Sequence, residues 1–302
     1  MTISRVVRGT LTGVAAALIA VSPVTLTPAL AAPAAPMMQS SQGNVMGLSG
    51  APNARDLGGI HIDGGDIKAG TVFRSDALNA LTSDDQQKLV SAGIVKIIDF
   101  RSPTEAAASP DQVPSSIPEE ALPIYDPAND FYVFVSKAIE GGPTVQQQEL
   151  GDGKGKQIMI DYYKWMVTDP TARGQFAATL KEIAGDNGPV MYHCSAGKDR
   201  TGWMTAILLQ ALGASKLDIY ANYLESNDLL AASNKAEMDA LVAKGLVTDP
   251  KLFDPILGVD ASFLHAADEQ VRQSYGSFDN FLSQGLGIDS GTVSALKAKL
   301  LG

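Results

Sequence analysis

Short apolar runs alternate along the chain with segments whose apolar residues recur at helical spacing. Residues 94–100 (IVKIIDF) form such a run, which carries Asp99 at its end, and residues 121–125 (ALPIY) and 189–192 (PVMY) form two more. Runs of this length are typical of buried strands. Residues 201–212 are nearly all apolar and predict a buried helix. This alternation predicts an α/β fold with a central, mostly parallel sheet flanked by helices.

Capping residues indicate where the first long helix begins and ends. Ser83 and Gln86 fit the spacing of a capping box, and Gly93 fits the position just past the end of a helix. From Lys216 onward the pattern is helical, apart from Gly, Pro and Asp residues near 245–260. We therefore expect a helical C-terminal region.

Residues 126–170 form a long excursion between the strand pattern at 121–125 and the next helix. Apolar residues recur at helical spacing from Phe131 to Ala138, and again from Ile158 to Met166. Between them, residues 141–156 (GGPTVQQQELGDGKGK) interrupt the pattern, and within this stretch residues 151–156 (GDGKGK) predict a flexible linker. The excursion predicts a mostly helical insertion.

The N-terminus has the features of an export signal. Arg5 and Arg8 precede a mostly apolar stretch, and Ala29-Leu30-Ala31 fits a cleavage site. We expect residues 1–31 to be a signal peptide, 32–48 a flexible linker and 49–302 one folded domain. The mature protein would be secreted, or periplasmic or in the cell envelope, without a stable membrane span, because the apolar stretch is short; a retained anchor is the alternative.

Charge and cysteine content narrow the function classes. The formal net charge is −10, and removal of the two signal arginines makes the mature chain more negative still. A negative surface disfavours nucleic acid and anionic membranes as general partners. The chain has one cysteine, Cys194, so no disulfide forms within it and a hydrophobic core must stabilise the fold.

That cysteine opens the segment Cys194–Asp199, which we call the Cys194 loop. A predicted strand ends at His193 and a predicted helix begins near Arg200. Amide groups at a helix N-terminus attract anions, and Gly197 permits the tight curl that turns them toward one centre. Arg200 adds a planar fork suited to phosphate oxygens. The same positive field favours the thiolate form of Cys194. A thiolate below a phosphate cradle can attack phosphorus and form a phosphocysteine that water then hydrolyses.

The motif HC-x5-RT, from His193 to Thr201, resembles the signature of the protein tyrosine phosphatase superfamily. The version HCSAGKDRTG is similar to that of the branch that holds secreted bacterial phosphatases. Further segments match that branch and extend the resemblance over most of residues 50–230: NARDLGG (53–59), FRS (73–75), DFRS (99–102) and YLESN (223–227).

This resemblance implies a tyrosine-phosphatase-like domain over residues 49–302, with 126–170 as a lid over the site. It implies that Cys194 is the nucleophile, that Arg200 binds phosphate, that Thr201 donates a hydrogen bond to the sulfur and that His193 orients the loop. It implies no cofactor and no metal, and it assigns the remaining substrate contacts to Ser195, Ala196, Gly197 and Lys198.

The proton donor for the leaving oxygen stays open among three carboxylates. Asp199 lies inside the Cys194 loop, and the resemblance favours it. Asp126, in the segment Tyr125-Asp126-Pro127, takes the place of an acid on a mobile loop. Asp99 ends a predicted parallel strand, where the crevice rule would direct it toward the site.

The expected activity is hydrolysis of phosphate monoesters, with a phosphorylated protein or a phosphoinositide as substrate. We expect phosphotyrosine as the main substrate and phosphoserine and phosphothreonine as further ones. Lys198 adds positive charge beside the loop, so a phosphoinositide-directed lipid phosphatase stays an alternative. A rhodanese-like sulfurtransferase and an inactive phosphate-binding module are weaker alternatives, because Cys194 and Arg200 are both present. For four charged residues two roles stay open, either structural ion pairs under the Cys194 loop or contacts with substrate: Arg55, Asp56, Arg74 and Arg101.

Overall fold

The computed structural model describes residues 44–302, and the predicted signal peptide lies outside these residues. Six strands form a mixed sheet in the order β1-β2-β5-β8-β6-β7. Four adjacent strands are parallel, and β1 and β2 add antiparallel pairs at one edge. This confirms the mostly parallel sheet. The strands are β1 (Asn44–Val45), β2 (Arg55–Asp56), β5 (Val72–Ser75), β6 (Lys96–Asp99), β7 (Glu119–Ala121) and β8 (Val190–His193), and a separate hairpin pairs β3 (His61–Ile62) with β4 (Gly65–Asp66).

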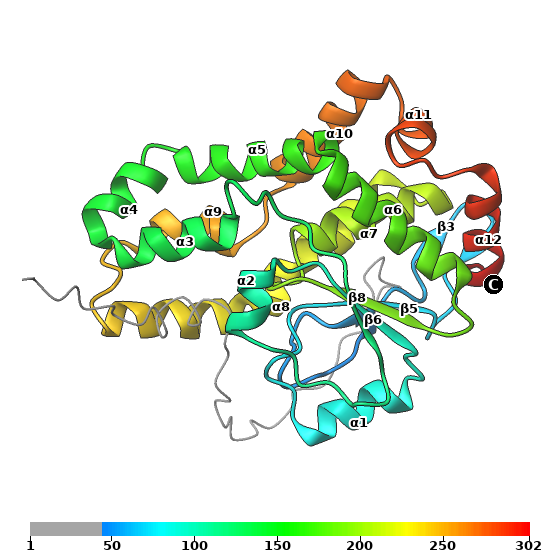
Figure 1. Ribbon diagram of the computed structural model, residues 1–302, viewed down its shortest axis with the longest axis horizontal. Helices are drawn as coiled ribbons and strands as arrows, with labels where there is room; N and C mark the ends of the chain where they lie inside the picture. The colour runs from blue at the N-terminus through cyan, green and yellow to red at the C-terminus, as the bar shows by residue number, and fades with distance from the viewer. Residues whose placement is uncertain (1–43) are drawn as a thin grey trace, which may run out of the picture.

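Helices cover both faces of the sheet (Figure 1). They are α1 (Ser83–Ser91), α2 (Pro103–Ala108), α3 (Phe131–Glu140), α4 (Gly142–Leu150), α5 (Lys154–Thr168), α6 (Pro170–Gly185), α7 (Arg200–Leu212), α8 (Lys216–Ala243), η2 (Pro250–Phe253), α9 (Asp254–Leu257), α10 (Ala261–Tyr275), α11 (Phe278–Asn280), η3 (Phe281–Gly285) and α12 (Ser290–Leu300). The predicted α/β class and the helical C-terminal region are therefore confirmed.

The central strands alternate their apolar side chains between two cores. In β8, Met191 packs in the core that contains Leu89 of α1, whereas Tyr192 packs in the larger core that contains Trp203 of α7. Neighbouring residues of a strand point to opposite faces, so a strand covered on both faces is apolar throughout. This accounts for the uninterrupted run that the sequence shows at 189–192.

The register of the parallel strands brings their carboxyl ends to one edge of the sheet. His193 of β8 is aligned with Ser75 of β5 and with Asp99 of β6. The Cys194 loop leaves the sheet at this edge and leads directly into α7. In an open α/β sheet this is the edge where ligands bind.

Two local predictions need correction. The capping box of α1 uses Thr82 and Asp85, one residue before the predicted Ser83 and Gln86, although Gly93 does follow the helix end with a φ of +70°. The strand predicted at 121–125 is β7, which lies at Glu119–Ala121, where its backbone pairs in parallel with Ile97–Asp99 of β6.

The predicted linkers also differ from the structure. Residues 154–156 of the linker predicted at 151–156 already belong to helix α5. Residues 142–150, where the apolar pattern breaks, form helix α4, with Pro143 in its first turn, where a missing N–H costs no hydrogen bond. Asn44 and Val45, inside the predicted N-terminal linker, form the edge strand β1.

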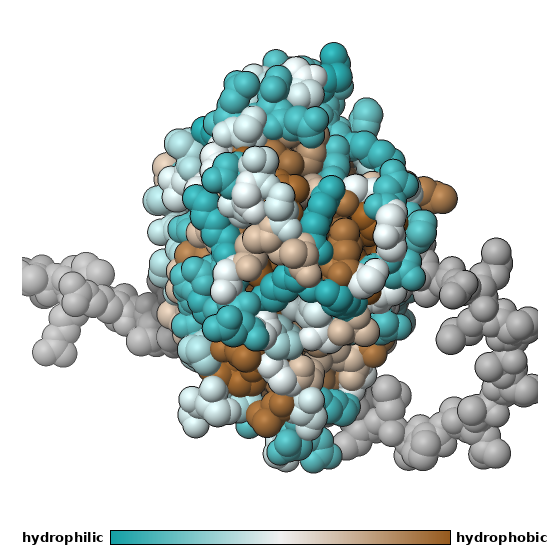
Figure 2. Space-filling view, turned by 90° about the vertical axis from the view of Figure 1, so that its right-hand side faces the viewer, coloured by the Kyte–Doolittle hydropathy of each residue, from teal (hydrophilic) through white to brown (hydrophobic). Residues whose placement is uncertain are grey.

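Hydrophilic residues cover most of the face that carries α10 to α12, and hydrophobic residues lie in the hollows between them (Figure 2). A groove of about 990 Å³ between α8 and α10 includes none of the residues of the Cys194 loop. Within residues 44–302, no helix has both the length and the apolar character that crossing a bilayer requires.

Candidate active site

The Cys194 loop is closed tightly between β8 and α7. Gly197 has a φ of +64°, and a Cβ added there would lie 2.4 Å from the carbonyl oxygen of Ser75. Both observations require glycine at this position. Cys194 is 2% exposed and lies where the strand ends. The backbone of Ser195 is held by a 2.9 Å hydrogen bond from the Ala77 amide.

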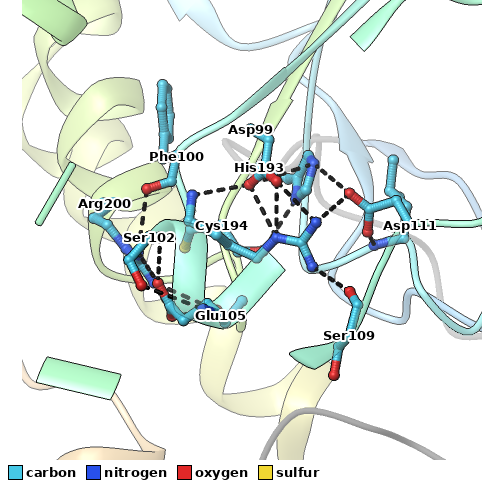
Figure 3. Close-up of polar contacts among 12 residues, drawn as sticks. Asp99, Phe100, Ser102, Glu105, Ser109, Asp111, His193, Cys194 and Arg200 are labelled. Atoms are coloured by element: carbon cyan, nitrogen blue, oxygen red, sulfur yellow. Dashed lines mark hydrogen bonds and ion pairs between the residues drawn. The ribbon is translucent and has the colours of Figure 1, made fainter. Parts of the chain in front are cut away.

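Arg200, the first residue of α7, is held by the carboxylate of Glu105 from α2. Its two terminal nitrogens donate hydrogen bonds of 2.7 and 2.8 Å to the two oxygens of Glu105, and one of them also reaches the Phe100 carbonyl at 3.2 Å (Figure 3). This bidentate pair fixes the plane of the guanidinium, and a guanidinium has further N–H groups for a phosphate. The positive charge of Arg200 therefore stands in a set position beside Cys194.

Glu105 accepts two further hydrogen bonds, from the Ser102 amide at 2.7 Å and from the Ser195 hydroxyl at 2.6 Å. Burial raises the pKa of a carboxyl group, but the Arg200 charge and these hydrogen bonds outweigh burial and lower the pKa of Glu105. Glu105 stays ionised and joins helix α2 to both ends of the Cys194 loop.

A second network holds the loop from below. Asn53 donates hydrogen bonds to the carbonyl oxygens of Ala196 and Gly197, at 2.8 and 3.1 Å, and Arg74 donates to Gly197 at 2.7 Å. Arg55 contacts Asn53 and forms a 3.2 Å ion pair with Glu225. The side chains of Arg55 and Arg74 are fully buried. Of the two roles left open for these arginines, the structural one fits their positions, because Arg74 binds a loop carbonyl, Arg55 holds Asn53, and neither borders the cavity over Cys194.

Asp99 belongs to a third charged cluster behind the loop. Arg101 donates hydrogen bonds to both oxygens of Asp99. His193 lies 3.3 Å from the carboxylate of Asp111 (Figure 3). Burial lowers the pKa of His193, but Asp99 and Asp111 outweigh burial and raise it to about 9. His193 is therefore an imidazolium near neutral pH, and its Nδ1 lies 3.1 Å from the Cys194 carbonyl oxygen.

Asp99, Asp111 and His193 are also the described residues close enough together to ligate a metal ion. The Arg101 guanidinium already contacts both of these carboxylates. It supplies the positive charge that a metal ion would bring.

The three candidate proton donors lie in different places. Asp199 borders the cavity over Cys194, where its Oδ2 accepts a 2.8 Å hydrogen bond from Lys198 and its Oδ1 a 3.0 Å one from Tyr163. Asp126 is half-buried, accepts hydrogen bonds from the Ala128 amide and the Asn129 side chain, and borders an outer groove. Asp99 is paired with Arg101 and does not border the cavity.

The cavity over Cys194 is small and has apolar walls. Its volume is about 100 Å³, below the roughly 300–1,000 Å³ of ordinary ligand sites. Ser195, Ala196, Lys198 and Arg200 contribute to its floor, whereas Gly197 and Thr201 do not border it. The hydroxyl of Thr201 is buried without a hydrogen-bond partner among the described residues. The walls come from Phe131, Tyr132, Val135 and Ser136 of α3, Tyr162 of α5, Asn234 of α8, and Ile256 and Leu257 of α9.

The tyrosine phosphatase family has a sequence model that matches residues 46–302 of this chain. The chain belongs to the tyrosine phosphatase family. It is 30% identical over 259 residues to a putative tyrosine-protein phosphatase of Cupriavidus necator, covering 85% of this chain and 90% of that protein. It is also 30% identical over 276 residues to the triple specificity protein phosphatase PtpB of Mycobacterium tuberculosis, covering 84% and 98%. A shorter match, 28% identical over 170 residues, is to a tyrosine-protein phosphatase of Nostoc commune.

As a phosphatase of this family, the chain acts on a phosphorylated substrate. The resemblance predicted from the HC-x5-RT motif is confirmed by the family match and by the relatives that cover most of the chain. The sulfurtransferase alternative receives no support from these comparisons.

Among the described residues, the side chains of Asn53, Glu105 and Tyr163 contact the Cys194 loop or its arginine without having been predicted as site residues. The spacing Ser102-x-x-Glu105 is a capping-box signal that predicts the start of α2. That signal does not reveal the contact with Arg200, which lies 95 residues further along the chain.

Proposed function

We propose that the chain is a phosphotyrosine phosphatase in which Cys194 attacks the phosphorus and Asp199 protonates the leaving oxygen. The observation that carries this proposal is the Arg200–Glu105 pair, which holds a phosphate-binding guanidinium over a loop that presents the sole thiol. In the first step, an S–P bond forms and the P–O bond to the leaving group breaks. Asp199 supplies the proton for that oxygen.

In the second step, water attacks the phosphocysteine. Asp199, now ionised, accepts a proton from this water, the S–P bond breaks, and inorganic phosphate and the Cys194 thiolate result. Loop amides and Arg200 stabilise the charge on the equatorial oxygens in both steps. The position of Asp199 supports this role, because Asp199 borders the cavity and neither Asp126 nor Asp99 does.

The walls of the cavity favour an aryl phosphate over a phosphoinositide. Phe131, Tyr132 and Tyr162 offer aromatic faces on which a phosphotyrosine ring can pack. Lys198 and Arg200 are the described cationic side chains that border the cavity. Both can contact the one phosphate over Cys194, which leaves no cationic side chain of the cavity lining for a second phosphate on an inositol ring.

Residues 126–170 are proposed to act as a lid. Side chains of α3 and α5 close the cavity, and the remaining volume of about 100 Å³ holds a few water molecules and no phosphopeptide side chain. Substrate entry therefore requires α3 or α5 to move. A lid also shields a thiolate that has no second cysteine to rescue it after oxidation.

The experiment that tests this function compares kcat/KM on two peptides that differ only in phosphotyrosine or phosphoserine, and on a phosphoinositide in mixed micelles. We expect the phosphotyrosine peptide to be preferred by at least about tenfold, since an aromatic pocket discriminates by roughly that factor. A higher kcat/KM on the phosphoinositide would overturn the substrate assignment. The relative named a triple specificity protein phosphatase is a reason to include phosphoserine.

Export remains a proposal that rests on residues 1–31 alone. We expect the mature protein outside the cytoplasm, with a new N-terminus near residue 32. N-terminal sequencing of the protein recovered from culture medium and cell envelope tests this. A retained Met1 in a membrane fraction would indicate an anchor instead.

A further inference from the structure

Tyr163, on the inner side of α5, contacts the Cys194 loop through its hydroxyl group. This hydroxyl donates a 3.0 Å hydrogen bond to Oδ1 of Asp199 and lies 2.7 Å from the hydroxyl of Tyr223 on α8. The two rings pack edge to face, with centroids 6.1 Å apart, and both side chains are buried. Helices α5 and α8 therefore meet at the side chain of one loop residue.

The protons of this chain have one consistent order. Burial raises the pKa of Tyr163 and of Tyr223 well above the ordinary value, so both hydroxyls keep their protons. The Tyr163 hydroxyl can donate one hydrogen bond, and the Asp199 carboxylate accepts it. The hydrogen bond between the tyrosines is therefore donated by Tyr223, and each donor in such a chain strengthens the next.

The two oxygens of Asp199 then differ in what they can do. Oδ1 accepts from Tyr163, so a proton added to Asp199 resides on Oδ2. In the structure Oδ2 accepts from Lys198, whose ammonium also donates to the Gly258 carbonyl. Lys198 borders the cavity, where a bound phosphate dianion attracts it. When a substrate phosphate draws Lys198 toward it, Oδ2 loses this partner while Oδ1 keeps its hydrogen bond from Tyr163.

We propose that Tyr163, supported by Tyr223, is a positioning residue that keeps the acid proton of Asp199 on Oδ2 and directs it toward the leaving oxygen. This inference rests on the proposed role of Asp199. Because Tyr163 is part of α5, the proton donor is oriented only while α5 is seated against the loop. The predicted lid then has a second task besides limiting access to Cys194, since its position determines whether the leaving group is protonated.

The test is the Tyr163→Phe variant, which keeps the packed ring and removes the hydroxyl. We expect kcat/KM to fall about tenfold on phenyl phosphate, the effect of one lost orienting hydrogen bond, and by less than about twofold on nitro-substituted aryl phosphates, which need little protonation. Inhibition by vanadate should be unchanged. Tyr220→Phe is the matched control, because Tyr220 of α8 donates to Asp268 at 3.2 Å, away from the cavity. It should leave both rates unchanged.

Asp199→Asn separates the two claims. Loss of rate on phenyl phosphate but not on nitro-substituted esters supports Asp199 as the acid, and Tyr163→Phe should then add nothing in that background. If Asp199→Asn lacks this selectivity, the proton-donor assignment fails, and the positioning role fails with it. Suppose that Asp199→Asn shows this selectivity for poor leaving groups. The positioning role alone is then overturned if Tyr163→Phe slows all substrates equally, or if its loss of rate is as large in the Asp199→Asn background as in the wild type.

Tyr223→Phe provides a second variant in case Tyr163→Phe does not fold. It leaves the Tyr163–Asp199 contact in place and removes the donor behind it. The same selectivity for poor leaving groups, smaller in size, supports the proposal. Equal rates on all esters, together with wild-type thermal stability, would overturn it.

Discussion

The floor of the cavity over Cys194 and its aromatic wall are held by different forces. On the floor, directional hydrogen bonds between charged or polar groups fix the loop: Ala196 accepts from Asn53, and Arg200 donates twice to Glu105. In the wall, flat rings stack without such bonds. The ring centroids of Phe131 and Tyr162 lie 5.1 Å apart. The buried hydroxyl of Tyr132 has no hydrogen-bond partner among the described residues.

This difference separates chemistry from access. A hydrogen-bonded charge network loses several contacts at once when it moves, so it keeps catalytic groups in register. Stacked rings can slide or swing at a cost of about 1 kcal/mol per pair. We therefore expect substitutions in the floor to change the reaction itself, and substitutions in the wall to change how quickly molecules reach Cys194.

The largest effect is expected for Cys194→Ser. The variant removes the proposed nucleophile and leaves the amide cradle and Arg200 unchanged, so turnover of a phosphotyrosine peptide should fall by at least about 10⁴-fold. Binding of vanadate or phosphate, measured by calorimetry, should stay within a few-fold of wild type. Turnover near the wild-type rate would show that the floor does not supply the nucleophile.

Glu105→Gln tests whether the Arg200 pair fixes the floor. Removing one partner of a buried ion pair should lower the free energy of unfolding by about 3 kcal/mol, and a bound phosphate should restore part of it because it supplies a new anion for Arg200. Denaturant unfolding with and without phosphate measures both. Glu120→Gln is the control, since Glu120 pairs with Lys96 near the surface, where such a pair contributes about 1 kcal/mol or less. Equal losses of unfolding free energy in Glu105→Gln and Glu120→Gln would show that the Arg200–Glu105 pair does not fix the floor.

Asp199→Asn and Asp126→Asn compare the proposed acid, which borders the cavity, with the candidate outside it. The first should lower kcat/KM by about 100-fold on esters with poor leaving groups and spare activated aryl phosphates. The second should be mild on both, because Asp126 borders another groove. The reverse pattern would assign the proton to a loop that moves into the site.

The smallest effect is expected in the wall. Phe131→Ala removes a ring that borders the cavity, and modification of Cys194 by a bulky maleimide should be about fivefold faster, equivalent to one lost stacking contact. Phe134→Ala on the same helix is the control, since Phe134 borders the outer groove and not the cavity. An unchanged rate for Phe131→Ala would mean that α3 does not limit access.

Local signals in the sequence account for what could be predicted of the fold and site. The apolar strand β8, the glycine of the loop and the apolar helix α7 follow one another in the chain, so their arrangement needs no distant contact. Helix α4 was missed because residues 142–150 are mostly polar, without apolar periodicity, and begin with Gly142-Pro143. Tertiary packing, with Leu150 and Gln146 buried, stabilises it instead.

The supports of the site could not be predicted, because each joins segments far apart in the chain. Asn53 lies 143 residues from Ala196, and Glu105 lies 95 residues from Arg200. Nothing in the local sequence of these residues distinguishes a support of the loop from an ordinary cap or turn. The resemblance to known phosphatases drew attention to Arg55 and Arg74 but left their role open, which only their burial against Gly197 and Asn53 decides.

The most direct test of the claim that the floor carries the reaction is detection of phosphate on Cys194. Rapid quenching of the wild-type protein during turnover of an aryl phosphate, followed by digestion and mass spectrometry, should find a phosphoryl group on the peptide that contains Cys194. Asp199→Ala should increase its amount, because activated esters still phosphorylate Cys194 while hydrolysis of the phosphocysteine loses its base. Turnover without any phosphocysteine, in both proteins, would contradict the account.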